Sequence, residues 1–157
     1  MALRQSIQIV QKLPTISADG YEPILIFGDF VVPANLVATD VVEMCVLPGG
    51  YVATAVKLIT DDLDSSATPT SSVDVGYVTG VAGAIDNART CGAEAIVGSL
   101  VGQTGGVAID NQAAFTLAAP LQTDRGIGIR IGTASATLIV GARIRMTVTA
   151  RPQLNGA

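Results

Sequence analysis

Histidine, the commonest general base and transition-metal ligand in proteins, is absent from this sequence. Its absence removes the Ser-His and Cys-His arrangements of nucleophilic catalysis. The sequence has two cysteines, Cys45 and Cys91. Cys45 falls inside an apolar run, where a thiol lacks an activating base, and buried cysteines behave as small hydrophobic residues. We therefore predict two buried structural thiols, with a disulfide as the less favoured alternative, and we assign no catalytic residue.

Three carboxylates, Asp61, Asp62 and Asp64, cluster in a polar segment that follows an apolar run. Several oxygens in one loop could hold Ca²⁺, but the spacing is not that of an EF-hand and its glycine is missing. The alternative is a turn in which Asp side chains accept hydrogen bonds from nearby backbone amides. A hydrolase with paired carboxylates would need a cleft and a raised pKa. We favour the turn and predict no metal and no cofactor.

Three arginines near the end of the chain, Arg130, Arg143 and Arg145, alternate with apolar residues. If the last two strands pair as a hairpin, with Ile131 opposite Leu138, all three arginines share its outward face. The plain interpretation is a soluble strand face. The functional interpretation is a basic stripe that meets an acidic surface on a partner.

The elements that would position these residues are short strands. Thr39–Thr60 holds two alternating apolar runs around Pro48-Gly49-Gly50, which predicts a hairpin. Further strands are expected within residues 23–32, 73–78, 93–101, 107–109, 127–131 and 138–148, and a short helix within 84–90. Gly28 suggests a bulge or a close backbone approach, and residues 113–118 would place Phe115 and Leu117 on one face. The predicted fold is all-β, an antiparallel β-sandwich of the jelly-roll or Greek-key type, with its strand order left open.

The 157 residues fit one domain, which we divide into an N-terminal arm (1–20), a sandwich (21–150) and a flexible tail (151–157). The arm carries Ile7, Ile9 and Leu13 without a clean period. Either the arm frays and contributes one edge strand, or these apolar residues dock on a neighbouring subunit. They are candidate partner-binding residues, together with Arg130, Arg143 and Arg145.

The composition is 49% hydrophobic and only 14% charged. A chain with so many apolar and so few charged residues is expected to expose apolar surface, which favours a protein whose surface is covered by other subunits. A net charge of −4 argues against a nucleic-acid partner. No uninterrupted apolar run approaches the roughly 18 residues of a membrane-spanning helix, so no membrane partner is expected. The first residues also lack the apolar core of a secretion signal.

Several turn and strand patterns resemble those of a known family, within residues 43–51 (EMCVLPGGY), 61–65 (DDLDS), 72–76 (SVDVG), 101–106 (VGQTGG) and 123–128 (TDRGIG). They resemble the head decoration, or cement, proteins of tailed bacteriophages. The resemblance implies a non-enzymatic virion protein that is made in the host cytoplasm. It implies binding to the major capsid protein on the outside of an icosahedral shell, as a homo-oligomer and often as a trimer. The alternatives are a shell-forming or tail structural protein, or a β-sandwich module that binds carbohydrate or a host surface.

Overall fold

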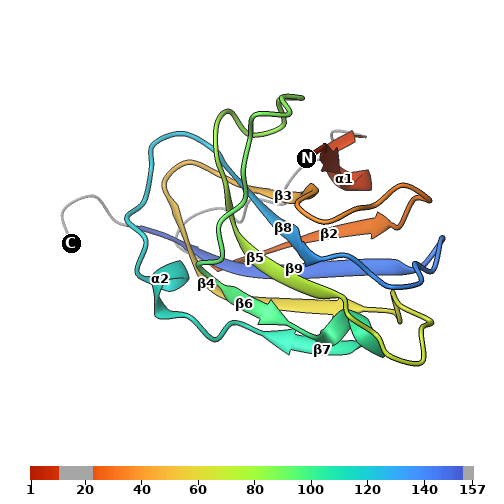
Figure 1. Cartoon of the computed structure of the whole chain (residues 1–157). Helices are drawn as coiled ribbons and strands as arrows, with labels where there is room; N and C mark the ends of the chain where they lie inside the picture. Colours follow the sequence, from red (N-terminus) through yellow and green to blue (C-terminus); the bar gives the residue numbers. More distant parts are fainter. Residues whose placement is uncertain (11–22, 154–157) are drawn as a thin grey trace.

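The computed structural model describes residues 1–10 and 23–153, and these fold into two β-sheets packed face to face (Figure 1). The five-stranded sheet has the order β1 (Leu3–Gln5), β3 (Val41–Leu47), β8 (Arg125–Thr133), β5 (Ser72–Val78), β6 (Ile96–Ser99). The four-stranded sheet has the order β2 (Ile24–Val31), β9 (Arg143–Pro152), β4 (Tyr51–Thr60), β7 (Gly106–Ile109). Three short helical turns accompany them: α1 (Ile7–Val10), η1 (Val101–Gln103) and α2 (Ala113–Thr116). None of these helices has the length and apolar character needed to cross a membrane.

The strand order identifies the type of sandwich. Without β1, the two sheets read β3-β8-β5-β6 and β2-β9-β4-β7, which is the order of an eight-stranded jelly roll. Every pairing between these eight strands is antiparallel, and only β1 pairs in parallel, with β3. The predicted all-β antiparallel sandwich is confirmed.

Both predicted hairpins are wrong. The Pro48-Gly49-Gly50 turn is present, but it carries the chain from β3 in one sheet to β4 in the other. Similarly, β8 pairs with β3 and β5, whereas β9 pairs with β2 and β4, so Ile131 and Leu138 are not partners. Period-two alternation fixes which face of a strand is buried, not which strand lies beside it. In a sandwich, consecutive strands can bury the same apolar pattern from opposite sides of one core.

Two local predictions also fail. Residues 84–90 form no helix, because Gly80 and Gly83 adopt positive φ and the segment folds into turns. In residues 113–118, the chain forms the single turn α2, which buries Phe115 completely and leaves Leu117 exposed. Phe115 stacks on Tyr77 with their ring centroids 4.9 Å apart and closes one end of the sandwich.

Gly28 marks a close backbone approach, as predicted. A Cβ atom at this position would lie 2.3 Å from the carbonyl oxygen of Met44. β2 therefore lies directly against β3 at one side of the sandwich, and α1 contacts both strands there. The Oγ of Ser6 donates a hydrogen bond to the same Met44 carbonyl, so the first residues help to close this side.

β9 ends at Pro152, and the amide of Gln153 still donates to the carbonyl of Gly50. The division into arm, sandwich and tail stays a prediction.

Candidate interaction surfaces

The outer face of the four-stranded sheet combines apolar and cationic side chains. β2 directs Leu25, Phe27 and Val31 outward, and all three are exposed. Strand pairing places Phe27 beside Thr147 of β9, which pairs in turn with Lys57 of β4.

The next row of this face runs from Asp29 through Arg145 to Ile59 and Val107. Apolar residues thus lie at both edges of the sheet, with charged residues between them.

Arg143 and Arg145 lie at the start of β9, between β2 and β4, and share one carboxylate. Their guanidinium nitrogens lie 3.7 and 3.6 Å from Oδ2 of Asp29, and the two side chains are 54% and 57% exposed. With Ile59 and Asp61 they line a shallow hollow. Ion pairs this long and this exposed contribute little to folding, so both guanidinium groups remain available to another molecule.

This face differs in charge from the rest of the chain. Of the eight basic and eleven acidic residues that the structure describes, four basic ones (Lys57, Arg143, Arg145, Arg151) and two acidic ones (Asp29, Asp61) lie here. The face therefore carries a net charge of +2, and the other described residues carry −5.

Arg130 does not share a face with the other two arginines, contrary to the prediction. It lies on β8 in the five-stranded sheet, where its Nε and one terminal nitrogen donate to Oδ2 of Asp74 at 3.0 and 2.5 Å. Oδ1 of Asp74 also accepts the amide of Gly98. Arg130 therefore forms an ion pair within its own domain. It lies apart from Arg143 and Arg145 because β8 and β9 belong to different sheets.

The first residues of the chain lie on their own domain. β1 adds to the edge of β3, and Arg4 pairs with Asp40 at 3.0 Å. Burial raises the pKa of Asp40, but hydrogen bonds from Ala2, Arg4 and Val37 outweigh it and lower that pKa. In α1, Ile7 is exposed and Ile9 is half-buried, while Leu13 lies outside the described residues. Partner binding by these three residues stays a prediction.

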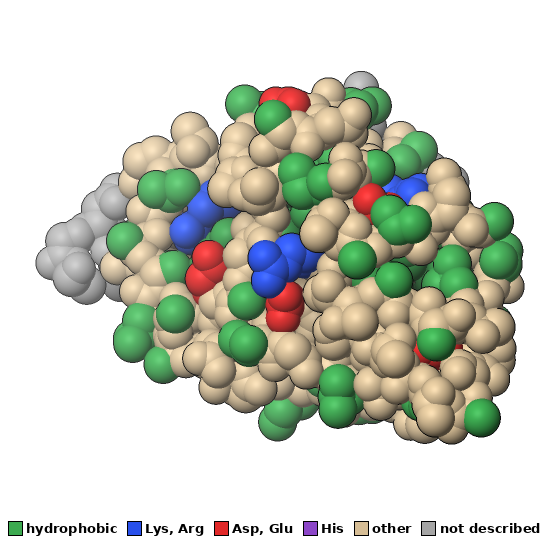
Figure 2. Space-filling model, viewed as in Figure 1, with side chains coloured by type: hydrophobic (Ala, Val, Ile, Leu, Met, Phe, Trp, Pro, Cys, Tyr) green, Lys and Arg blue, Asp and Glu red, His purple; other side chains and the backbone are tan. Residues whose placement is uncertain are grey.

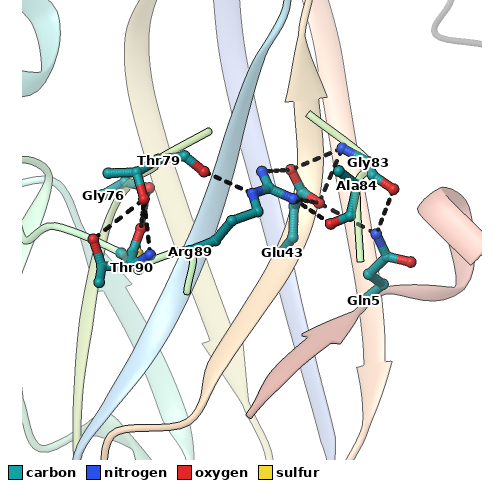
Figure 3. A network of polar contacts seen from close by, with 9 residues as sticks. Gln5, Glu43, Gly76, Thr79, Gly83, Ala84, Arg89 and Thr90 are labelled. Atoms are coloured by element: carbon teal, nitrogen blue, oxygen red, sulfur yellow. Dashed lines mark hydrogen bonds and ion pairs between the residues drawn. The ribbon is translucent and has the colours of Figure 1, made fainter. Parts of the chain in front are cut away.

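The loop of residues 79–92 crosses the outer face of the five-stranded sheet and is held there by a buried ion pair (Figure 3). Arg89 and Glu43 are 2% and 0% exposed. The two terminal nitrogens of Arg89 donate to the two carboxylate oxygens at 2.9 and 2.6 Å, its Nε donates to the carbonyl of Thr79, and one terminal nitrogen also donates to the carbonyl of Ala84. We call this pair and its hydrogen bonds the Glu43–Arg89 clasp.

The clasp also joins the loop to β1. Gln5 donates from its side chain to both Glu43 and the carbonyl of Gly83, and the amide of Gly83 donates to Glu43. A Cβ atom at Gly126 would lie 2.1 Å from a Glu43 oxygen, so a larger residue here would displace the carboxylate of the pair. No sequence pattern predicted this clasp. Its only signals were a lone glutamate in an apolar strand and a lone arginine in a Gly/Ala-rich loop.

The Asp61–Asp64 segment is the turn that the sequence favoured. Asp64 is buried, and its two oxygens accept backbone N–H groups from Ser66, Thr70, Ala136 and Thr137. Burial raises the pKa of Asp64, but these four hydrogen bonds outweigh it and lower the pKa to about 2. Among the described residues, no group of acidic or thiol side chains could hold a metal ion.

Both thiols are free and buried, as predicted. Burial raises the pKa of Cys45 far above its usual range and that of Cys91 to about 12. A thiol with such a pKa is almost entirely protonated at neutral pH, and the thiolate is the nucleophilic form.

Solved structures show what this fold resembles. A chain in the capsid of Ralstonia phage GP4 matches with a TM-score of 0.92 and 30% sequence identity, over 98% of this chain and 100% of that one. The protein belongs to a family of bacteriophage capsid proteins. A chain of the cyanophage Pam1 capsid asymmetric unit shares the fold, with a TM-score of 0.68 and 23% identity over 90% of this chain and 96% of that one. The acidic stable capsid of Helicobacter pylori bacteriophage KHP30 gives a TM-score of 0.54 and 12% identity, over 84% and 90%.

No protein-family model matches this capsid protein, and no curated protein matches it. The relationship supports a structural, non-enzymatic role in the phage virion. It also supports assembly with other capsid proteins.

Proposed function

We propose that this capsid protein is a decoration, or cement, protein that binds the outside of the shell as an oligomer. Its partner on the shell is the major capsid protein. The outer face of the four-stranded sheet is the side that meets the shell. The observation that carries the proposal is the charge of this face, which is +2 in a chain of net −4.

A surface of this kind suits a contact between two different proteins. Two copies that met through the same face would bring Arg143 and Arg145 of each against like charges, which is unfavourable. An acidic shell surface would instead pair with both guanidinium groups, while Phe27 and Leu25 supply apolar contact at the edge. Arg130, which is bound to Asp74, has no part in this contact.

The effect on the shell would be mechanical. A protein that binds the assembled lattice, and not its separated subunits, stabilises the lattice by RT ln(1 + [L]/Kd) for each site. At a free concentration of 100 Kd this amounts to about 2.7 kcal/mol per site. Because each bound copy contributes its own stabilisation, many weakly bound copies together strongly stabilise the shell against disassembly.

Co-sedimentation with empty phage heads tests the proposal. The double variant Arg143→Gln/Arg145→Gln should bind about tenfold more weakly, because two exposed charge pairs of ~0.7 kcal/mol each are lost. Wild-type binding should weaken as salt is raised. A matched control, Ala67→Glu/Thr68→Glu, makes the same change in net charge in an exposed loop and should bind like the wild type.

Three outcomes would contradict the proposal. Failure of the wild-type protein to co-sediment with heads would exclude decoration. Equal binding by the Arg143/Arg145 variant would exclude this face. Closed shells formed by the purified protein alone would favour a shell-forming protein instead.

A further inference from the structure

A long stretch of the chain is almost free of charge. Residues 95–123 contain one charged side chain, Asp110, among 29 residues. At the chain's average of 14% charged residues, about four would be expected. Solubility normally places charged residues on exposed segments, so an exposed segment without them needs a physical reason.

This stretch forms one rim of the sandwich, made of β6, η1, β7 and α2. β6 is the last strand of one sheet and β7 the last strand of the other, and the two contact each other. They run side by side along the lower part of the molecule in Figure 1, and several hydrophobic side chains are visible at that lower edge in Figure 2. We call the surface of residues 95–123 the uncharged rim.

The uncharged rim is also apolar. Six large hydrophobic side chains are exposed on it: Val97, Leu100, Val107, Ile109, Leu117 and Leu121. Val107 and Ile109 lie on the edge strand β7, where the rim borders the outer face of the four-stranded sheet. The described residues hold sixteen such side chains, so the rim has more than a third of them in about a fifth of the residues. Exposed apolar surface at this density marks interaction sites, and interface cores are depleted of charge.

We propose that the uncharged rim is the surface through which copies of this chain contact one another. This inference deepens the proposed function, which requires an oligomer, by naming its contact surface. Electrostatics favours a second copy as the partner of this surface. Identical chains of net charge −4 repel wherever acidic surfaces meet, and the rim, with Asp110 as its one charged side chain, brings the fewest like charges together.

The ends of both sheets favour the same conclusion. β6 and β7 each span four residues and each pairs with one strand only, so their outer backbone groups are open. An open strand edge readily takes up another chain. The short length of both strands limits indefinite growth and is suited to a closed oligomer.

The test measures self-association of the full chain without heads, by mass photometry and sedimentation velocity over a range of protomer concentrations. Wild-type protein should be an oligomer. The variant Ile109→Lys/Leu117→Lys changes residues that are 67% and 79% exposed, so the fold should survive. Its association should weaken at least a hundredfold, because each lysine places a charge in the contact.

The matched control is Val81→Lys/Ile85→Lys, which adds the same charge at residues 75% and 84% exposed in the loop of residues 79–92. It should keep the wild-type mass. A monomeric wild type, a rim variant of unchanged mass, or equal dissociation of the control would each overturn the inference. Circular dichroism of both variants checks that they fold. Oligomers that fail to bind heads would refute the decoration role and leave the rim contact standing.

Discussion

Replacing one partner of the Glu43–Arg89 clasp should cost far more stability than replacing an arginine of the exposed ion pairs with Asp29. In Arg89→Met, the Glu43 carboxylate stays 0% exposed and loses both charged donors. The carbonyls of Thr79 and Ala84 lose their hydrogen bonds as well. Removing one member of a buried pair typically costs about 3–5 kcal/mol, out of a total stability of about 5–15 kcal/mol.

The double variant Glu43→Met/Arg89→Met should cost less than the sum of its two single variants. Once both charges are gone, no buried charge is left without a partner, and apolar residues of similar volume can replace a buried pair at little cost. We expect a coupling energy of about 2–3 kcal/mol from the four-variant cycle. Arg143→Met is the control: its side chain is 54% exposed and lies 3.7 Å from a partly exposed Asp29, so it should cost about 1 kcal/mol or less.

Urea denaturation followed by circular dichroism measures these free energies. All variants must be compared at one protomer concentration, because self-association adds to apparent stability. A cost below about 1 kcal/mol for Arg89→Met, or strictly additive costs in the cycle, would refute the view that the pair is buried and mutually dependent.

Three smaller predictions follow from single contacts. Gly28→Ala should lower the free energy of unfolding by about 1–3 kcal/mol in urea titrations, because its Cβ would meet the Met44 carbonyl oxygen at 2.3 Å; an unchanged midpoint would mean that β2 moves freely. The folded-state pKa of Asp64, about 2, lies below its unfolded value, so its stabilisation is complete above about pH 4 and is lost as pH falls towards 2. Asp64→Asn should not lose this stability in acid. If the free energies of unfolding of wild type and variant fell in parallel between about pH 4 and pH 2, the prediction would be contradicted. Calcium or a chelator should leave the melting midpoint unchanged, because the Asp64 oxygens already accept backbone amides; a rise with calcium would restore the metal hypothesis.

The sequence predicted buried faces better than it predicted neighbours. Alternation correctly marked Ile144, Met146 and Val148 as inward and Arg143 and Arg145 as outward. It could not tell that β9 pairs with β2, which lies more than a hundred residues earlier in the chain. Local pattern determines which side of a strand is apolar, whereas the choice of partner depends on the packing of the whole sandwich.

The clasp shows a different limit. Glu43 sits in an apolar strand. Val42 and Met44 belong to the main core, whereas Val41 belongs to a separate buried cluster and Glu43 is buried under the loop, so β3 has both faces covered. The sequence gives no sign of this cover, because the loop that provides it is a glycine-rich segment with no regular period. Only the fold brings Arg89 over β8 and β3, where Gly126 leaves room for the ion pair.

The two kinds of arginine in this protein should behave differently under mutation. Arg4, Arg89 and Arg130 each bond to an acidic side chain that is itself buried, so exchanging that partner for another protein would leave a buried carboxylate unpaired. Arg143 and Arg145 share one partly exposed carboxylate at more than 3.5 Å and can exchange water for a partner at little cost. Losses of head binding in clasp variants should therefore scale with the fraction of folded protein, whereas losses in the Arg143/Arg145 variant should persist per folded molecule.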